Sequence, residues 1–277
     1  MNISYKRDDK LEYKRKVIDG LVAYNNTFAG GAFADTANVY VFEDGKLVGG
    51  CHTELEWNWI FVEAIFYQSQ EVFMKIMNEL YKYYKGKAEG ILVESYIDER
   101  IEDYKAAGFE VLGVFSDKPV GKESHIMASR EMNIIPIDCS YEVEVMKEKN
   151  ESHAKTVNEQ VKAYNEKLKI DETKIEIEYN AFDQDKLVGG VYGYLIQDYL
   201  YVSILWVDEA YRGNDIATKL MDLIEEEAKE KGYNNSYLGT CTFQAKGFYE
   251  KSGYEVSMII PNCPKGYDDF TMVKKIG

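Results

Sequence analysis

An internal repeat is the feature of this sequence that most constrains its fold. Lys46-Leu47-Val48-Gly49-Gly50 recurs unchanged as Lys186-Leu187-Val188-Gly189-Gly190, at an offset of 140 residues. Ala23-Tyr24-Asn25 recurs as Ala163-Tyr164-Asn165 at the same offset of 140. Chance does not keep a register over such a distance. The sequence therefore indicates two diverged copies of one domain, each with the same order of helices and strands.

The two copies differ in length at one place. Beyond it the offset becomes 145 residues, so that Tyr104 matches Tyr249 and Gly108-Phe109-Glu110-Val111 matches Gly253-Tyr254-Glu255-Val256. Most of the extra residues of the second copy lie near positions 207–217, where the first copy has only the short segment 67–73. We therefore expect a loop in the second copy that the first copy lacks.

Each copy has the pattern of an α/β domain with a mixed sheet. Helical spacing of apolar residues predicts a first helix, and two strands joined by a tight turn follow it. A third strand, a longer amphipathic helix, a strand, a short helix and two final strands complete the unit. In the second copy the main segments are residues 152–167, 199–207, 215–231, 237–240, 243–251, 254–260 and 270–274. The predicted domains are residues 1–132 and 139–277.

Composition and charge exclude several classes of protein. The 277 residues carry a net charge of −15, divided between residues 1–140 (−7) and 141–277 (−8). Such a field repels nucleic-acid phosphates and favours cationic small molecules near the surface, and it fits a simple contribution to solubility equally well. No apolar run approaches the roughly 20 residues that span a bilayer, and the first residues lack a secretory signal. Four scattered cysteines (Cys51, Cys139, Cys241, Cys263) predict reduced thiols in the cytoplasm and no metal site. We expect neither nucleic acid nor membrane as a partner.

The extra segment of the second copy has the character of an anion site. A strand leads into Arg212-Gly213, and an amphipathic helix follows. The first N–H groups of a helix have no partner within the helix, and the helix dipole favours negative charge there. Gly213 lets the backbone approach a ligand closely, and Arg212 adds a charged anchor. Taken alone, these residues also fit an ordinary turn between a strand and a helix.

Two linked motifs resemble the GNAT superfamily of N-acetyltransferases. Arg212 and Ala217 fill the first and last places of the coenzyme A-binding pattern (Gln/Arg)-x-x-Gly-x-(Gly/Ala), and residues 245–254 match Ala-x-x-Phe-Tyr-x-x-x-Gly-(Phe/Tyr). The resemblance covers Tyr141–Gly277, and the repeat extends it to residues 1–130. It implies two tandem GNAT-like acyltransferase domains, with a degenerate first domain that lacks the coenzyme A loop. It also implies acetyl-CoA as co-substrate and transfer of its acetyl group to the primary amine of a small molecule.

The resemblance implies roles for single residues. The pantetheine arm would pair with the strand that ends at Trp206-Val207, and the amine would attack directly, so that the protein mainly positions the reactants. Tyr249 matches the general acid of the family, which protonates the departing thiolate. The expected coenzyme A-binding residues are Trp206, Val207, Arg212, Gly213, Asn214, Asp215, Ile216 and Ala217.

Three departures from the family pattern bear on activity. Asp215 replaces the middle glycine, and its carboxylate would lie near the pyrophosphate unless it turns away to serve the helix start. Thr242 stands three residues before Ala245, where many relatives have asparagine. No general base is evident: Glu209, Asp198 and a water relay all remain open. Tyr249 itself matches the pattern, but the first copy keeps Tyr104 at the same place, so a tyrosine here fits packing as well as catalysis.

Two functions fit these observations. In the first, the chain is an N-acetyltransferase whose first copy is a scaffold, and it acts as a monomer that is an intrachain pseudo-dimer. In the second, it is a non-catalytic acyl-CoA-binding or scaffold protein built from degenerate GNAT domains. The intact Arg212-Gly213 start and the Phe248-Tyr249 signature favour the enzyme, whereas Asp215 and the missing base favour the alternative. The acceptor is open among polyamines, aminoglycosides, amino acids and peptide amines.

Overall fold

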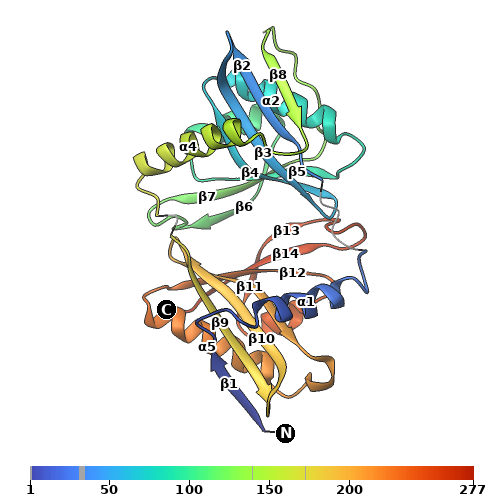
Figure 1. The fold of residues 1–277 in the computed structure, drawn as a ribbon, viewed down its shortest axis with the longest axis vertical. Coiled ribbons are helices and arrows are strands. Elements are labelled where there is room, and N and C mark those ends of the chain that lie inside the picture. Colours follow the sequence, from blue (N-terminus) through green and yellow to red (C-terminus); the bar gives the residue numbers. More distant parts are fainter. Residues whose placement is uncertain (1, 31–34, 139, 172) are drawn as a thin grey trace. The chain divides into compact units, whose positions relative to one another are not determined.

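The structure, a computed structural model, describes residues 2–30, 35–138, 140–171 and 173–277. These residues form two sheets of seven strands each (Figure 1). Each sheet is antiparallel except for one parallel pair, which is β11 with β12 in one sheet and β4 with β5 in the other. The predicted fold class, α/β with mixed sheets, is confirmed.

Within its described residues, the first copy contributes ten elements in chain order. They are β1 (Ile3–Arg7), α1 (Lys14–Asn25), β2 (Asn38–Glu43), β3 (Lys46–Glu56), β4 (Trp59–Tyr67), α2 (Gln70–Tyr84), β5 (Gly90–Ser95), α3 (Asp98–Ala106), β6 (Glu110–Ser116) and β7 (Glu123–Ser129).

The second copy repeats this order and adds one turn of 3-10 helix after its third long strand. Its elements are β8 (Glu142–Met146), α4 (Glu151–Lys167), β9 (Ile175–Asp183), β10 (Lys186–Ile196), β11 (Tyr199–Val207), η1 (Glu209–Tyr211), α5 (Ile216–Glu230), β12 (Asn235–Cys241), α6 (Lys246–Lys251), β13 (Glu255–Ile260) and β14 (Asp269–Lys275). The short strands β1 and β8 were not predicted.

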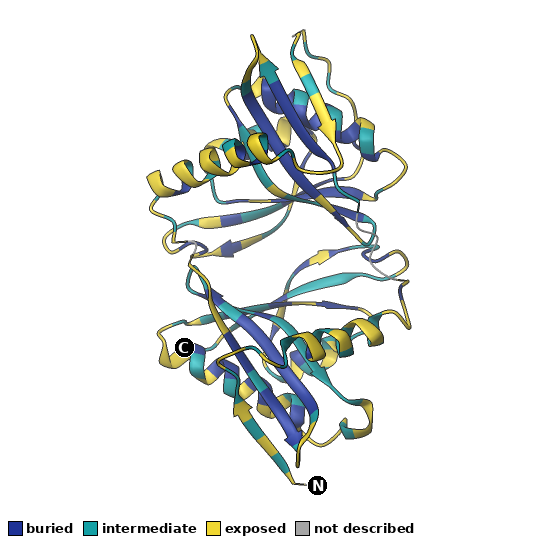
Figure 2. Ribbon diagram, in the orientation of Figure 1, coloured by how far each residue is buried: buried dark blue, intermediate teal, exposed yellow. Residues whose placement is uncertain are grey.

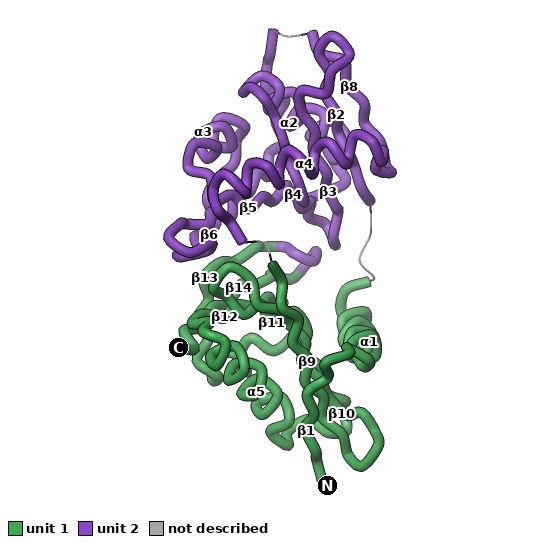
Figure 3. The backbone as a smooth tube through the Cα atoms, turned by 60° about the vertical axis from the view of Figure 1, so that its left-hand side comes forward, with its two compact units in different colours: residues 1–31, 172–261, 267–277 green, residues 32–171, 262–266 purple. Residues whose placement is uncertain are grey.

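The compact units of the structure differ from the copies in the sequence. Unit 1 contains residues 1–31, 172–261 and 267–277, and unit 2 contains residues 32–171 and 262–266 (Figure 3). β1 pairs with β9 of the second copy, and β8 pairs with β2 of the first. The first strand and helix of each copy therefore join the sheet that the other copy builds. The ranges 1–132 and 139–277 follow the sequence repeat, and the units depart from them by this exchange.

The repeated Gly-Gly pair explains how helices pack on both faces of each sheet. In unit 1, a Cβ on Gly189 would lie 3.3 Å from Ile216 of α5, and a Cβ on Gly190 would lie 2.5 Å from Val17 of α1. Neighbouring residues of a strand face opposite sides of the sheet, so the two glycines admit one helix on each face. In unit 2, Gly49 faces Val72 of α2 and Gly50 faces Val157 of α4 in the same way.

The core of each unit lies between its central strands and the helix that follows the third long strand. In unit 1, α5 buries Leu220, Met221 and Ile224 against β9, β10 and β11. In unit 2, α2 buries Phe73, Ile76 and Leu80 against β2, β3 and β4. Figure 2 shows these central strands as the buried part of each sheet, with the outer sides of the helices exposed.

Candidate functional site

A pocket in unit 1 opens where two central strands separate. β11 pairs in parallel with β12 only from Tyr199 to Val202, while its other edge stays paired with β10 as far as Val207. The pocket in this opening has a volume of about 330 Å³. Of the predicted site residues it brings together Trp206 and Val207 of β11, Arg212, Ala217 of α5 and Tyr249 of α6.

The loop before α5 is held by its own polar side chains. Asp208 accepts a hydrogen bond from the Ala210 N–H at 3.0 Å and forms an ion pair with Lys186 at 2.9 Å. The hydrogen bond from Lys186 lowers the pKa of the Asp208 carboxyl. The amide of Asn214 donates to the carbonyl oxygens of Tyr211 and Arg212. These contacts fix the direction in which the chain enters the helix.

Arg212 is the charged group of the pocket lining. Its Nε donates to the Val207 carbonyl at 3.2 Å, and its guanidinium lies over the Tyr24 ring with Cζ 4.8 Å from the ring centroid. These two contacts hold the guanidinium in place. Its other N–H donors remain available to a ligand.

The backbone at the start of α5 supplies further donors. The first helical hydrogen bond runs from the Lys219 N–H to the Asp215 carbonyl at 3.0 Å. The N–H groups from Gly213 to Thr218 have no hydrogen-bond acceptor among the described residues. Such a row of amides at a helix N-terminus suits a phosphate group.

The backbone conformation of Asp215 explains why the family pattern has glycine at this position. Its φ is +56°, in the left-handed region, and its side chain makes no capping hydrogen bond. A residue with a Cβ adopts this conformation at a cost that glycine does not bear. The carboxylate is exposed, and it raises the pKa of Tyr5 together with the larger effect of burial. The helix-capping role that the sequence left open is thus absent.

Tyr249 of α6 belongs to the lining of the pocket. The side chain is 8% exposed and packs edge-on against Tyr254, with ring centroids 5.9 Å apart. Its hydroxyl has no hydrogen-bond partner among the described residues, and burial raises its pKa. The hydroxyl therefore stays protonated at neutral pH, as a proton donor must.

The exchanged helix α1 forms part of the same pocket, which sequence reasoning did not predict. Leu21 and Tyr24 belong to the lining, and the Tyr24 hydroxyl donates to the Phe243 carbonyl at 3.0 Å. A Cβ on Gly20 would lie 2.4 Å from the Trp206 ring, so α1 lies directly on Trp206. The repeated triplet Ala-Tyr-Asn was the available signal, because it recurs at the same offset of 140 residues as the Gly-Gly segment.

The predicted candidates for a general base lie away from this pocket. Glu209 is exposed in η1, and Asp198 accepts a hydrogen bond from Asn235 in the turn before β11. Among the described residues, the lining contains the hydroxyls of Ser203 and Thr240 but no carboxylate. The described residues of the lining therefore offer no acidic side chain that could act as a general base.

Comparison with known proteins identifies the family. The model of the acetyltransferase (GNAT) family matches residues 143–254. A blasticidin-S acetyltransferase of Streptomyces morookaense is 34% identical over 99 residues, which are 35% of this chain and 73% of that protein. The chain belongs to the GNAT acetyltransferase family. A second relative, an acetyltransferase of Agrobacterium fabrum, is 39% identical over 72 residues, or 26% of this chain and 53% of that protein.

A solved acetyltransferase structure aligns over about half of the chain. A crystal structure of an acetyltransferase from Bacillus cereus has 28% sequence identity and a TM-score of 0.43, and the alignment covers 47% of this chain and 96% of that one. The residues that match the GNAT model include the loop before α5 and α6, but they do not include α1. The lining residues Leu21 and Tyr24 thus come from outside the matched GNAT segment.

Three further findings concern metal binding, membrane-spanning helices and the cysteines of this GNAT protein. Among the described residues, no cluster of three or more His, Cys, Asp or Glu side chains is placed to hold a metal ion. No helix in the described ranges is long and apolar enough to cross a membrane. Cys51, Cys241 and Cys263 are buried, and Cys139 lies outside the described residues.

Proposed function

We propose that the protein is an acetyl-CoA-dependent N-acetyltransferase that acts on the primary amine of a small molecule. The observation that carries the proposal is the pocket of unit 1, whose lining joins the edge of β11 at Trp206-Val207, Arg212, a protonated Tyr249 and Ala217, which belongs to the row of amides at the start of α5. Acetyl-CoA fits this arrangement, because its diphosphate needs N–H donors and a cation while its pantetheine arm needs an unpaired strand edge.

Each group would contribute in a different way. Arg212 and the amides of Gly213, Asn214, Ile216 and Ala217 would hold the diphosphate, with Asp215 beside them. The free edge of β11 at Trp206-Val207 would pair with the pantetheine arm, and an N–H there would polarise the thioester carbonyl. As the amine nitrogen bonds to the acetyl carbon, the carbon–sulfur bond breaks. Tyr249 would then give its proton to the departing sulfur, and the amine would lose a proton to water.

Charge and the named relative support a small cationic acceptor. The net charge of −15 raises the concentration of cations near the surface. The relative from Streptomyces morookaense is named for blasticidin S, a small molecule. Four cysteines far apart in the sequence, with no CxxC pair, favour a reducing compartment, and we place the protein in the cytoplasm as a monomer.

A screen of acetyl-CoA consumption tests the proposal. The panel contains blasticidin S, a polyamine, an aminoglycoside, an amino acid and a peptide with a free amine. We expect coenzyme A to be released from acetyl-CoA in the presence of at least one of these amines. The Arg212→Gln variant should lower the rate of that release. Tight binding of acetyl-CoA without turnover on any amine would favour the alternative, a non-catalytic acyl-CoA-binding or scaffold protein. The lining without a carboxylate and the carboxylate of Asp215 are the observations on that side.

A further inference from the structure

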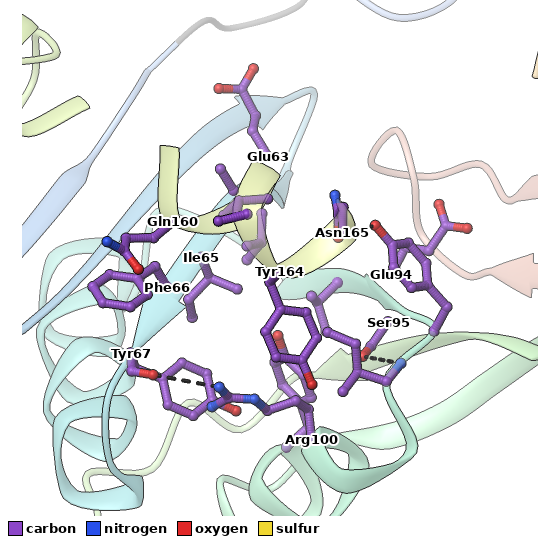
Figure 4. Close-up of a pocket in the computed structure, with 18 of the residues that line it drawn as sticks. Glu63, Ile65, Phe66, Tyr67, Glu94, Ser95, Arg100, Gln160, Tyr164 and Asn165 are labelled. Atoms are coloured by element: carbon purple, nitrogen blue, oxygen red, sulfur yellow. Dashed lines mark hydrogen bonds between the residues drawn. The ribbon is translucent and has the colours of Figure 1, made fainter. Parts of the chain in front are cut away.

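Unit 2 keeps an opening between its central strands although it has no loop for a diphosphate. β4 pairs with β5 only over Trp59–Phe61 and Gly90–Leu92, and a pocket of about 220 Å³ lies beyond this point. The pocket is lined by β4, β5, α3 and the exchanged helix α4 (Figure 4). All of these elements belong to unit 2.

The start of the following helix excludes a diphosphate from this pocket. Only Gln68 and Ser69 separate β4 from α2, and the Ser69 hydroxyl accepts the Val72 N–H at 3.3 Å. The side chain thus occupies part of the amide row that would bind phosphate oxygens. The ligand of this pocket must be recognised in another way.

Arg100 gives the pocket its distinct chemistry. The repeat aligns Arg100 with Ala245, which lines the pocket of unit 1, so a cation replaces a methyl group at a corresponding lining position. Its Cζ lies 3.7 Å from the centroid of the Tyr67 ring and 5.9 Å from that of Tyr164. Figure 4 shows the guanidinium between these two rings, at the floor of the pocket.

The guanidinium is held by stacking more than by ion pairing. Its polar contacts are long: 3.5 Å to the Tyr67 carbonyl and 3.9 Å to the carboxylate of Asp103. Asp103 instead accepts a short hydrogen bond of 2.8 Å from the Tyr67 hydroxyl. Neither contact is a bidentate pair, so the planar fork can still take a carboxylate.

The other charges of the lining leave Arg100 as an attractive centre for an anion. The carboxylate of Glu63 is paired with Lys149 at 2.7 Å, and that of Glu94 with Lys118 at 2.9 Å. Figure 4 shows the Glu63 carboxylate directed away from the pocket floor. The lining also contains a second cation, Lys167.

We propose that this pocket binds a small organic carboxylate with a flat apolar body. The carboxylate takes the free edge of the Arg100 guanidinium, and the body lies against the rings of Tyr164 and Phe66. The first copy is then a ligand-binding domain that has lost coenzyme A binding. This inference stands apart from acetyl transfer, because every residue in it belongs to unit 2.

Calorimetric titration of the full chain with 2-naphthoate tests the proposal. We expect binding of 2-naphthoate, and affinities about tenfold or more lower for 2-naphthamide and for 2-naphthylmethylamine, which lack the anion. Saturating acetyl-CoA should leave the titration unchanged. No binding at millimolar concentration, equal binding of the amine, or displacement by acetyl-CoA would each overturn the proposal.

Variants locate the site. Arg100→Gln should lower 2-naphthoate affinity about tenfold or more, whereas Arg100→Lys, which keeps the charge, should retain part of it. Arg15→Gln, at an exposed surface pair with Asp19, is the matched control and should have no effect. An unchanged affinity in Arg100→Gln contradicts the proposal. Because the ligand series uses the unmodified chain, it decides the question even if Arg100→Gln does not fold.

Discussion

Asp215 is the residue at which this chain departs from the coenzyme A-binding pattern, and it defines the first prediction. We expect Asp215→Gly to tighten acetyl-CoA binding by a factor of about two to five, because an exposed like-charge contact costs on the order of 0.5–1 kcal/mol. Glycine also accepts the φ of +56° without strain. Titration with acetyl-CoA measures the change. Weaker binding in the glycine variant would mean that the carboxylate orders the loop.

Tyr249 carries the second prediction. Tyr249→Phe keeps the buried ring and removes the proton donor, so it should lower turnover while leaving acetyl-CoA affinity nearly intact. A general acid contributes about 10²–10⁴-fold to rate. Tyr104→Phe is the matched control, because Tyr104 is buried at the corresponding place in unit 2 and lines its pocket. Unchanged turnover in both variants would make the tyrosine structural in both copies.

Glu178 links stability to pH in unit 1. Burial raises the pKa of Glu178 from 4.5 to about 6, and its Oε2 is buried with no hydrogen-bond partner among the described residues. The native state therefore holds a proton that the unfolded state releases as the pH rises from 4.5 to about 6, and stability is lost over that range. We expect Glu178→Gln to raise the free energy of unfolding above pH 6, with the gain vanishing toward pH 4.5.

The same strand offers a control of opposite sign. A hydrogen bond from Lys14 lowers the pKa of Glu176, so the charged form of this carboxyl is stabilising. Glu176→Gln should therefore lower stability at neutral pH, and the loss should shrink as the pH falls through the native pKa of the carboxyl. Urea unfolding of both variants at several pH values measures these effects. A Glu178→Gln variant that is less stable than the parent above pH 6 would contradict the account.

Single residues of the site were predictable to different degrees. Arg212, Gly213 and Ala217 follow a local pattern with a local cause, the start of a helix, and the sequence predicted them together. Leu21 and Tyr24 were not predicted, because they reach the pocket through tertiary structure from nearly 200 residues earlier in the chain. The left-handed conformation of Asp215 was also not predicted, because the sequence alone allowed its side chain to cap the helix.

At the scale of elements, the exchange of β1 and α1 for β8 and α4 determines which helix covers one face of each sheet. Val17 of α1 faces Gly190, and Val157 of α4 faces Gly50, so both helices present valine to the same kind of glycine. Judged by this contact, either helix could pack on either sheet. For that reason the repeat predicts that a helix covers this face of each sheet, but it does not predict which helix.

Removal of the first strand and helix is therefore expected to damage the second copy's site. A chain that begins at Asp35 lacks the β1 edge of the unit 1 sheet and the lining residues Leu21 and Tyr24. We expect it to bind acetyl-CoA at least about tenfold more weakly, because the buried face of β10 and β11 loses its cover. Gly20→Ala in the full chain is a milder test, since the new Cβ would displace Trp206. Undiminished binding by the shortened chain would show that α1 is dispensable.

At the scale of the whole molecule, the two units share one architecture but differ in what their pockets can bind. Between β11 and α5 the chain has eight residues, 208–215, whereas between β4 and α2 it has only Gln68 and Ser69. The length difference was visible in the sequence as the change of offset from 140 to 145. Unit 2 offers an anion the guanidinium of Arg100, at the position of Ala245 in unit 1, whereas unit 1 offers helix amides and Arg212. This difference could not be read from the sequence without the exchanged helices.

The stoichiometry of acetyl-CoA binding tests the central claim most directly. Only unit 1 has the amide row together with Arg212, so calorimetric titration of the full chain should give one acetyl-CoA per chain. Arg212→Gln should weaken that binding about tenfold or more, while Arg100→Gln should leave it unchanged. A stoichiometry near two, or binding that Arg212→Gln leaves intact, would contradict the assignment of the acetyl-CoA site to unit 1.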